Sequence, residues 1–222
     1  MKISEVHLLT NSLSETEFFY KQKLGFEVLE KTDELLFFKV GTSKLCFHLS
    51  DEIQKPVYHF AFDIPENRLF EALEWVSERA EAIPYNDNEY NEYIVDFSNW
   101  NAKSFYFNDT NGNILECIVR YDLKNVSDEN FNGNSFIKIS EIGFVVADVF
   151  GFCDQINQQY QTDYFVMQPK RENFSVLGDN YGLFIVSGEN RNWFPTMHKA
   201  QPFWSKVLFE SYGKQYEMIF NP

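Results

Sequence analysis

The sequence predicts an α+β fold built from repeated units, each a strand and a helix followed by three further strands. Two segments that alternate apolar and polar residues, 2–9 and 57–63, are each followed directly by a helical pattern. The first segment later returns almost unchanged, because KISEVH at residues 2–7 reappears as KISEIG at residues 138–143. This recurrence predicts two βαβββ modules that pair with each other, and a third, degenerate βαβββ module.

The first unit begins with the strand at residues 2–9. Residues 12–15, Ser-Leu-Ser-Glu, match a helical capping box, and Gly25 follows the helical pattern as a stop signal. Turn residues then separate three short apolar runs, which we expect to be strands: Phe26–Lys31, Glu34–Val40 and Lys44–Ser50.

The second unit starts with the strand at Val57–Asp63, and Pro65 marks the beginning of its helix. Residues 109–113, Asp-Thr-Asn-Gly-Asn, are a strong hairpin signal, since Asn-Gly accepts the positive φ of a tight turn. The other strands of this unit are expected at Tyr93–Phe97, Lys103–Phe107 and Asn113–Arg120.

A polar, Asn-rich stretch from residue 121 to residue 136 is typical of a linker. We therefore predict a two-module domain over residues 1–120, the linker 121–136, and a third module with a C-terminal hairpin over residues 137–222. Its helix should start after Asp148, and its hairpin should turn at Tyr212-Gly213. The aromatic loop at 191–195 is a candidate lid.

Composition excludes several classes of partner. The 222 residues carry a net charge of −14, so nucleic acids and anionic membranes are poor partners. No apolar run approaches the length of a membrane span and no leader peptide is evident, so we expect a cytoplasmic protein. The widely spaced Cys46, Cys117 and Cys153 fit core positions better than a disulfide framework.

Four ligand-capable side chains stand on otherwise apolar strands. His7 and His59 lie on the first strands of units one and two, and His48 and Glu116 lie on the last strands. Pseudo-twofold symmetry between the two units would bring all four to one face, opposite the apolar neighbours that pack under the helices.

A lone strand histidine is usually an ordinary hydrogen-bonded or partly exposed residue. A buried carboxylate, however, is costly unless it is paired or bound to metal. Two histidines and one carboxylate with open positions suit Fe, Zn, Mn or Ni. We therefore predict that His7, His59 and Glu116 bind a divalent metal ion. His48 is either a fourth ligand or a nearby base or hydrogen-bond donor.

The chain resembles the vicinal oxygen chelate superfamily, which includes glyoxalase I, bleomycin-resistance proteins, fosfomycin-resistance enzymes and extradiol dioxygenases. The resemblance covers about residues 1–120 and rests on the first strand and on residues 19–28, 58–61 and 105–116. It implies a curved mixed sheet with a metal-binding cup, and it places His7, His59 and Glu116 at ligand positions. Related proteins are often homodimers, which makes a homodimer an expectation here too.

The same resemblance exposes departures from pattern. His48 stands where bacterial glyoxalase I has a glutamate, which argues against isomerase activity on glutathione hemithioacetals. Tyr106 matches the tyrosine ten residues before the ligand glutamate of extradiol dioxygenases, but Thr110 replaces their proline. The acid–base histidine of those enzymes has no counterpart at residues 97–99.

Two functions remain open from sequence. The first is a metal-dependent dioxygenase, lyase or isomerase acting on a small substrate with vicinal oxygens. In it Tyr106 would donate a hydrogen bond to the substrate anion and His48, if not a ligand, would be a base; ordinary sheet packing of Tyr106 is the alternative. The second is a metal-free protein that binds a small molecule or an antibiotic.

Overall fold

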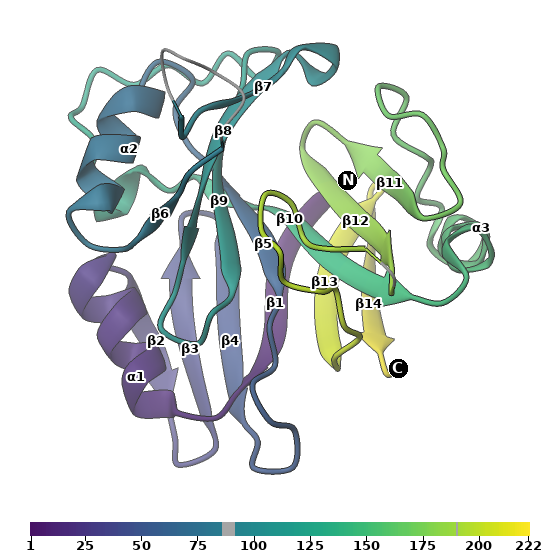
Figure 1. Cartoon of the computed structure of the whole chain (residues 1–222), viewed down its shortest axis with the longest axis horizontal. Helices are drawn as coiled ribbons and strands as arrows, with labels where there is room; N and C mark the ends of the chain where they lie inside the picture. Colours follow the sequence, from purple (N-terminus) through teal and green to yellow (C-terminus); the bar gives the residue numbers. More distant parts are fainter. Residues whose placement is uncertain (86–91, 190) are drawn as a thin grey trace.

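The computed structural model describes residues 1–85, 92–189 and 191–222, and their strands form two sheets (Figure 1). The six-stranded sheet contains β1 (Lys2–Thr10), β2 (Glu27–Lys31), β3 (Leu35–Val40), β4 (Ser43–Leu49), β13 (Ser205–Ser211) and β14 (Lys214–Phe220). The eight-stranded sheet contains β5 (His59–Asp63), β6 (Ala82–Ile83), β7 (Val95–Phe97), β8 (Ala102–Asn108), β9 (Ile114–Arg120), β10 (Lys138–Val146), β11 (Phe174–Asp179) and β12 (Gly182–Gly188).

The helices follow the first strand of each unit. The helix α1 (Leu13–Glu17) continues into a π-helical turn, η1 (Phe18–Lys23), and Ser12 caps it by accepting the Glu15 backbone N–H at 3.2 Å. The α-helices of units two and three are α2 (Leu69–Ser77) and α3 (Val149–Tyr160). In Figure 1, α1 and α2 lie on one side of the molecule and α3 lies on the opposite side. No helix in the described residues is both long enough and apolar enough to cross a membrane.

The strand orders confirm the α+β class and the modules. They are β14-β13-β1-β4-β3-β2 in one sheet and β11-β12-β10-β5-β9-β8-β6 in the other, with β7 paired to β8. Unit one therefore keeps the order of a complete βαβββ module, and unit three contributes β10, β12 and β11. Residues 164–167, which follow α3 and were expected to form a further strand of unit three, add only an isolated bridge from Tyr164 to Leu177.

The expected pairing of unit one with unit two is wrong. Strand β5 of unit two pairs antiparallel with β10 of unit three, with Phe60 opposite Ile142. Strand β1 of unit one pairs antiparallel with β13 of the C-terminal hairpin, with Val6 opposite Val207. The hairpin thus completes the first sheet as unit three completes the second, and strand pairing crosses the predicted boundary between residues 1–120 and 137–222.

Both sheets turn an apolar face toward one shared core, which alternation along the strands makes possible. The apolar neighbours of the four ligand-capable residues were expected to face inward. Of these, Val6, Leu8, Phe47, Phe60, Leu115 and Cys117 belong to this core, while Leu49 is exposed. Aromatic side chains from both sheets meet in it, as where Phe184 of β12 lies 4.9 Å from Phe209 of β13. The polar strand residues are consequently left on the opposite face of each sheet.

A close backbone contact joins the two sheets. The Ser43 hydroxyl donates to the Ile3 carbonyl at 2.7 Å and accepts the Ile139 N–H at 3.1 Å. Just before it, Gly41 adopts φ +54°, and a Cβ there would lie 1.9 Å from the Ile137 carbonyl oxygen. Only glycine allows this approach of the β3–β4 turn to the start of β10.

The hairpin should be an integral part of the core. Replacing Phe209, which is fully buried on β13, by alanine should cost about 3–5 kcal/mol of unfolding free energy. Ile219→Ala on β14, at a residue 57% exposed, should stay within about 0.5 kcal/mol. Urea unfolding of both variants measures the difference. Equal losses would mean that the hairpin is only an appendage.

Candidate metal and substrate site

The predicted site residues fall into two groups, one on each sheet. His59 and Glu116 lie together on the eight-stranded sheet, where Glu141 joins them, and ligand atoms of the three lie within 4.8 Å of one another. We call this group the carboxylate site. His7 and His48 lie on the six-stranded sheet with Cys46, which we call the thiol cluster. The predicted convergence of His7 and His48 with His59 is therefore wrong, because β1 and β5 belong to different sheets.

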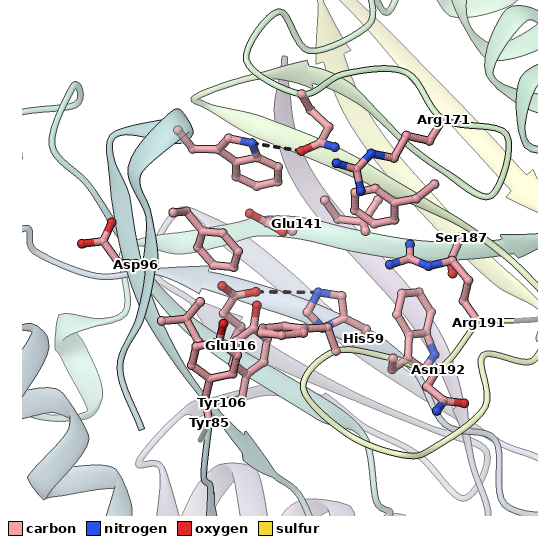
Figure 2. A pocket seen from close by; sticks show the side chains of 18 residues that line it. His59, Tyr85, Asp96, Tyr106, Glu116, Glu141, Arg171, Ser187, Arg191 and Asn192 are labelled. Carbon is pink, nitrogen blue, oxygen red and sulfur yellow. Dashed lines mark hydrogen bonds and ion pairs between the residues drawn. The ribbon is translucent and has the colours of Figure 1, made fainter. Parts of the chain in front are cut away.

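The register between β5 and β9 brings His59 and Glu116 of the carboxylate site together. β5 and β9 are parallel, with His59 opposite Ile114 and Ala61 opposite Glu116. The His59 Nδ1 lies 3.0 Å from the Ile114 carbonyl oxygen, so in the neutral ring Nδ1 carries the proton. This leaves the lone pair on Nε2, which lies 3.7 Å from Glu116 Oε2 (Figure 2).

Glu141 is the member of the carboxylate site that the sequence did not predict. It lies on β10 opposite Ala61 of β5, beyond an irregularity between Ile139 and Glu141. The repeat does contain a signal, because Glu141 corresponds to Glu5 and stands in an otherwise apolar strand.

Trp193 explains why position 143 is a glycine. A Cβ at Gly143 would lie 2.6 Å from Cη2 of Trp193, so the indole fills the space of a side chain. The same indole lies 5.3 Å from the His59 ring and is 5% exposed. Residues 191–195, the candidate lid, thus supply one wall of the site, and their movement stays a prediction.

Burial shapes the protonation of the carboxylate site. It lowers the pKa of His59 to about 4, which keeps the ring neutral. Burial, and after it the negative charge of Glu141, raises the pKa of Glu116. Glu116 Oε1 makes no hydrogen bond to any residue that the structure describes. A neutral imidazole and two carboxylates, one with a free buried oxygen, are the donor set of a divalent cation, so these residues fit the metal that the resemblance implies.

Tyr106 lies beside this donor set. It stands on β8 directly opposite Glu116 of β9, and its ring centroid is 6.1 Å from that of His59. Burial, followed by the charges of Glu116 and Glu141, raises the pKa of its phenol well above the usual value. Tyr106 therefore keeps its proton at neutral pH and can donate a hydrogen bond.

A cavity of about 360 Å³ opens onto the carboxylate site. Aromatic side chains form much of its lining: Tyr85, Phe97, Trp100, Tyr106, Phe174, Trp193 and Phe194. Two guanidinium groups, of Arg171 and Arg191, also line it (Figure 2). The volume suits a small ligand, and the aromatic lining suits one with a flat apolar part.

Neither arginine has an acidic partner among the described residues, although the chain has 33 acidic residues against 19 basic ones. The Arg191 guanidinium lies 4.4 Å from the Phe174 ring centroid. Partial burial, followed by the charge of Arg171, lowers the pKa of Arg191. Two neighbouring cations that lack a carboxylate within the described chain favour an anionic ligand.

The comparison with protein families decides the relationship. The family model described as Glyoxalase/Bleomycin resistance protein/Dioxygenase superfamily matches residues 2–172. The chain belongs to this superfamily. A structure described as a putative dioxygenase from Bacillus subtilis subsp. subtilis str. 168 aligns with a TM-score of 0.63 at 12% identity, covering 100% of this chain and 86% of the other, and so shares its fold.

Shorter superfamily structures match about half of the chain. The fosfomycin resistance protein FosX from Listeria monocytogenes aligns at 21% identity and a TM-score of 0.42, covering 54% of this chain and 93% of its own. A lactoylglutathione lyase from Agrobacterium tumefaciens aligns at 23% identity and a TM-score of 0.41, covering 53% and 92%. No curated protein matches the chain by sequence.

The buried guanidinium of Arg120 offsets the negative charges of Glu141 and Asp63 at and beside the carboxylate site. The guanidinium is 1% exposed, forms an ion pair with Glu141, and lies 3.4 Å from Asp63 Oδ1 through Nε. Lys138 Nζ also reaches Asp63, at 3.1 Å. A buried cation is thus shared between the site and the strand end beside it.

Removing the Arg120 guanidinium should lower the free energy of unfolding. Arg120→Met leaves Glu141 as an uncompensated buried carboxylate, so unfolding free energy measured in EDTA should fall by about 3–5 kcal/mol. Lys103→Met breaks the exposed ion pair with Asp96, 3.3 Å long, and should cost no more than about 1 kcal/mol. A similar, small loss in both variants would show that Arg120 does not compensate the site.

Proposed function

We propose that the chain is a divalent-metal-dependent enzyme that acts on a small substrate with two neighbouring oxygens, through dioxygenase, lyase or isomerase chemistry. The observation that carries this proposal is the carboxylate site itself, with three buried ligand atoms within 4.8 Å and one carboxylate oxygen that no described residue hydrogen-bonds. A protein that only binds a small molecule has no need for such a donor set, since its buried carboxylates are costly without a cation.

Different residues of the site would bind the metal ion and stabilise the substrate. His59 Nε2, Glu116 and Glu141 would hold the ion, which would supply Lewis-acid stabilisation of negative charge on the substrate oxygens. Tyr106 would donate a hydrogen bond to the same developing charge. His48, predicted as a base, lies on the other sheet, so the proposal gives it no part in this chemistry.

The cavity wall indicates the substrate class. The aromatic side chains would orient a flat substrate and exclude water, while Arg171 and Arg191 would bind an anionic group such as a carboxylate. We therefore propose an acidic substrate, with its vicinal oxygens toward the carboxylate site and its anionic group toward the arginines.

Metal content tests the first part of this proposal. His59→Ala and Glu116→Gln should each lower the bound metal of purified, reloaded protein by one equivalent per chain, measured by elemental analysis. His198→Ala, in an exposed loop, should leave the content unchanged. Wild-type protein without stoichiometric metal, or with metal unaffected by His59→Ala, would favour the metal-free binding function instead.

Ligand charge tests the second part. By anaerobic calorimetry on metal-loaded protein, 3,4-dihydroxybenzoate should bind about 10-fold or more tightly than catechol, since a hydrogen bond to a charged group contributes about 1.5–3 kcal/mol. Arg191→Gln should remove most of this difference, whereas Lys199→Gln, exposed in the same loop, should keep it. Equal affinity for both probes in the wild type would count against an acidic substrate.

A further inference from the structure

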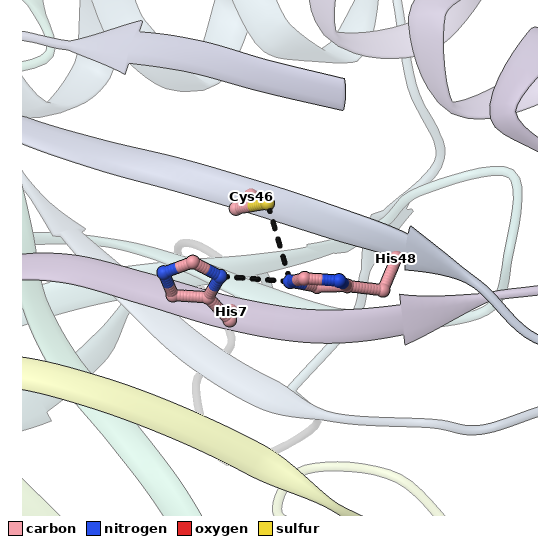
Figure 3. A group of neighbouring side chains, drawn as sticks. All are labelled: His7, Cys46 and His48. Carbon is pink, nitrogen blue, oxygen red and sulfur yellow. Dashed lines mark hydrogen bonds between the residues drawn. The ribbon is translucent and has the colours of Figure 1, made fainter. Parts of the chain in front are cut away.

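The thiol cluster stands on the polar face of the six-stranded sheet, away from the carboxylate site. It comes from two adjacent parallel strands, with His7 of β1 directly opposite Cys46 of β4. His48 follows Cys46 by two residues, so both point to the same face (Figure 3). Because the strand ladder fixes all three backbone positions, the cluster needs no loop movement to assemble.

The distances approach those of a tetrahedral metal site. His7 Nδ1 lies 2.8 Å from His48 Nε2, and that nitrogen lies 3.5 Å from Cys46 Sγ. Zinc bonds of ~2.05 Å to nitrogen and ~2.3 Å to sulfur would separate two nitrogens by ~3.3 Å, and nitrogen from sulfur by ~3.6 Å. The Cys46 Sγ–His48 Nε2 pair already fits, and the two nitrogens need to part by only about 0.5 Å. Cys46 Sγ lies within 4.8 Å of a His7 ring nitrogen.

A hydrogen bond from His7 to Glu5 fixes the His7 tautomer that a metal ligand needs. Glu5 Oε1 lies 2.6 Å from His7 Nε2, so in the neutral ring Nε2–H donates to the carboxylate. The lone pair then falls on Nδ1, the atom that faces His48. A carboxylate that orients a histidine in this way is the usual partner of a metal-bound imidazole.

The residues around the thiol cluster leave room for a cation, and the His48 side of the cluster is open to solvent. Phe37 lies edge-on to His7 at 5.4 Å, and Trp204 lies edge-on to His48 at the same distance. The nearby Lys206 is paired with Glu217 at 3.7 Å, which offsets its charge. His48 is only half-buried, so an ion held here would reach solvent on that side.

We propose that Cys46 Sγ, His7 Nδ1 and His48 Nε2 form a second metal site that takes Zn²⁺ or Co²⁺, with its fourth position open to water or a ligand. On binding, Cys46 releases its thiol proton to solvent. The proton on His48 Nε2 is lost and the His48 ring takes up the tautomer protonated at its own Nδ1, which leaves the Nε2 lone pair for the metal. The thiolate distinguishes this site from the carboxylate site, whose oxygen donors prefer harder ions. The proposal does not depend on the proposed function, because it uses none of the same residues.

Cobalt loading of the full-length protein tests it. Addition of Co²⁺ to metal-free wild type should produce a near-ultraviolet thiolate-to-cobalt charge-transfer band. In the His59→Ala variant, which lacks the competing carboxylate site, this band should saturate at one equivalent. Cys46→Ser should abolish the band, and Cys153→Ser, at another buried cysteine, should keep it. Glu5→Gln should leave the band but weaken cobalt affinity by about 10- to 100-fold.

His59→Ala separates this proposal from the proposed function. It should leave the band intact while lowering total zinc from two equivalents per chain to one. A wild-type protein without the band, or a band that survives Cys46→Ser in a folded variant, would overturn the second site. If Cys46→Ser fails to fold, His48→Ala, at a half-buried position, is the substitute variant and must also lose the band.

Discussion

The antiparallel pairing of β5 with β10 is the constraint on which the carboxylate site depends. It places Glu141 beside a strand that already presents His59, and β9 adds Glu116 from the other side. It also brings the loop after β12 over the same face, where Trp193 fills the space above Gly143. With β5 occupied by β10, unit one is completed by the hairpin through β13, and both sheets can then face one core.

The charged residues around the carboxylate site leave a net negative charge that a divalent cation would offset. The site and the strand end beside it hold three carboxylates, Asp63, Glu116 and Glu141, against two cations, Arg120 and Lys138. With all five ionised and His59 neutral, one negative charge is left in a buried region, where it is costly. A divalent ion would change this balance from −1 to +1. The two cavity arginines add to that positive charge, so the loaded pocket would favour an anionic substrate.

Local pattern was enough to predict the modules but not their partners. Alternation along β1, β5 and β9 correctly assigned apolar residues such as Val6, Phe60 and Leu115 to the core, and polar residues to the opposite face. Pairing could not be predicted in the same way, because β1, β5 and β10 have similar alternating sequences and each could accept either neighbour. Glu141 was missed for a related reason: its role arises only from contact with β5, which is distant in sequence.

The two sheets show how the same module is completed differently. Units one and two each have two ligand-capable side chains, His7 with His48 and His59 with Glu116. Unit one is paired with the C-terminal hairpin and unit two with unit three. Unit three contributes the carboxylate of Glu141, whereas the hairpin places Lys206 opposite His7. In the first sheet the third donor comes instead from unit one itself, as the thiol of Cys46. Because ligand softness governs which ion a site holds, oxygen donors on one sheet and a thiol on the other would give the two sites different metal preferences within one chain.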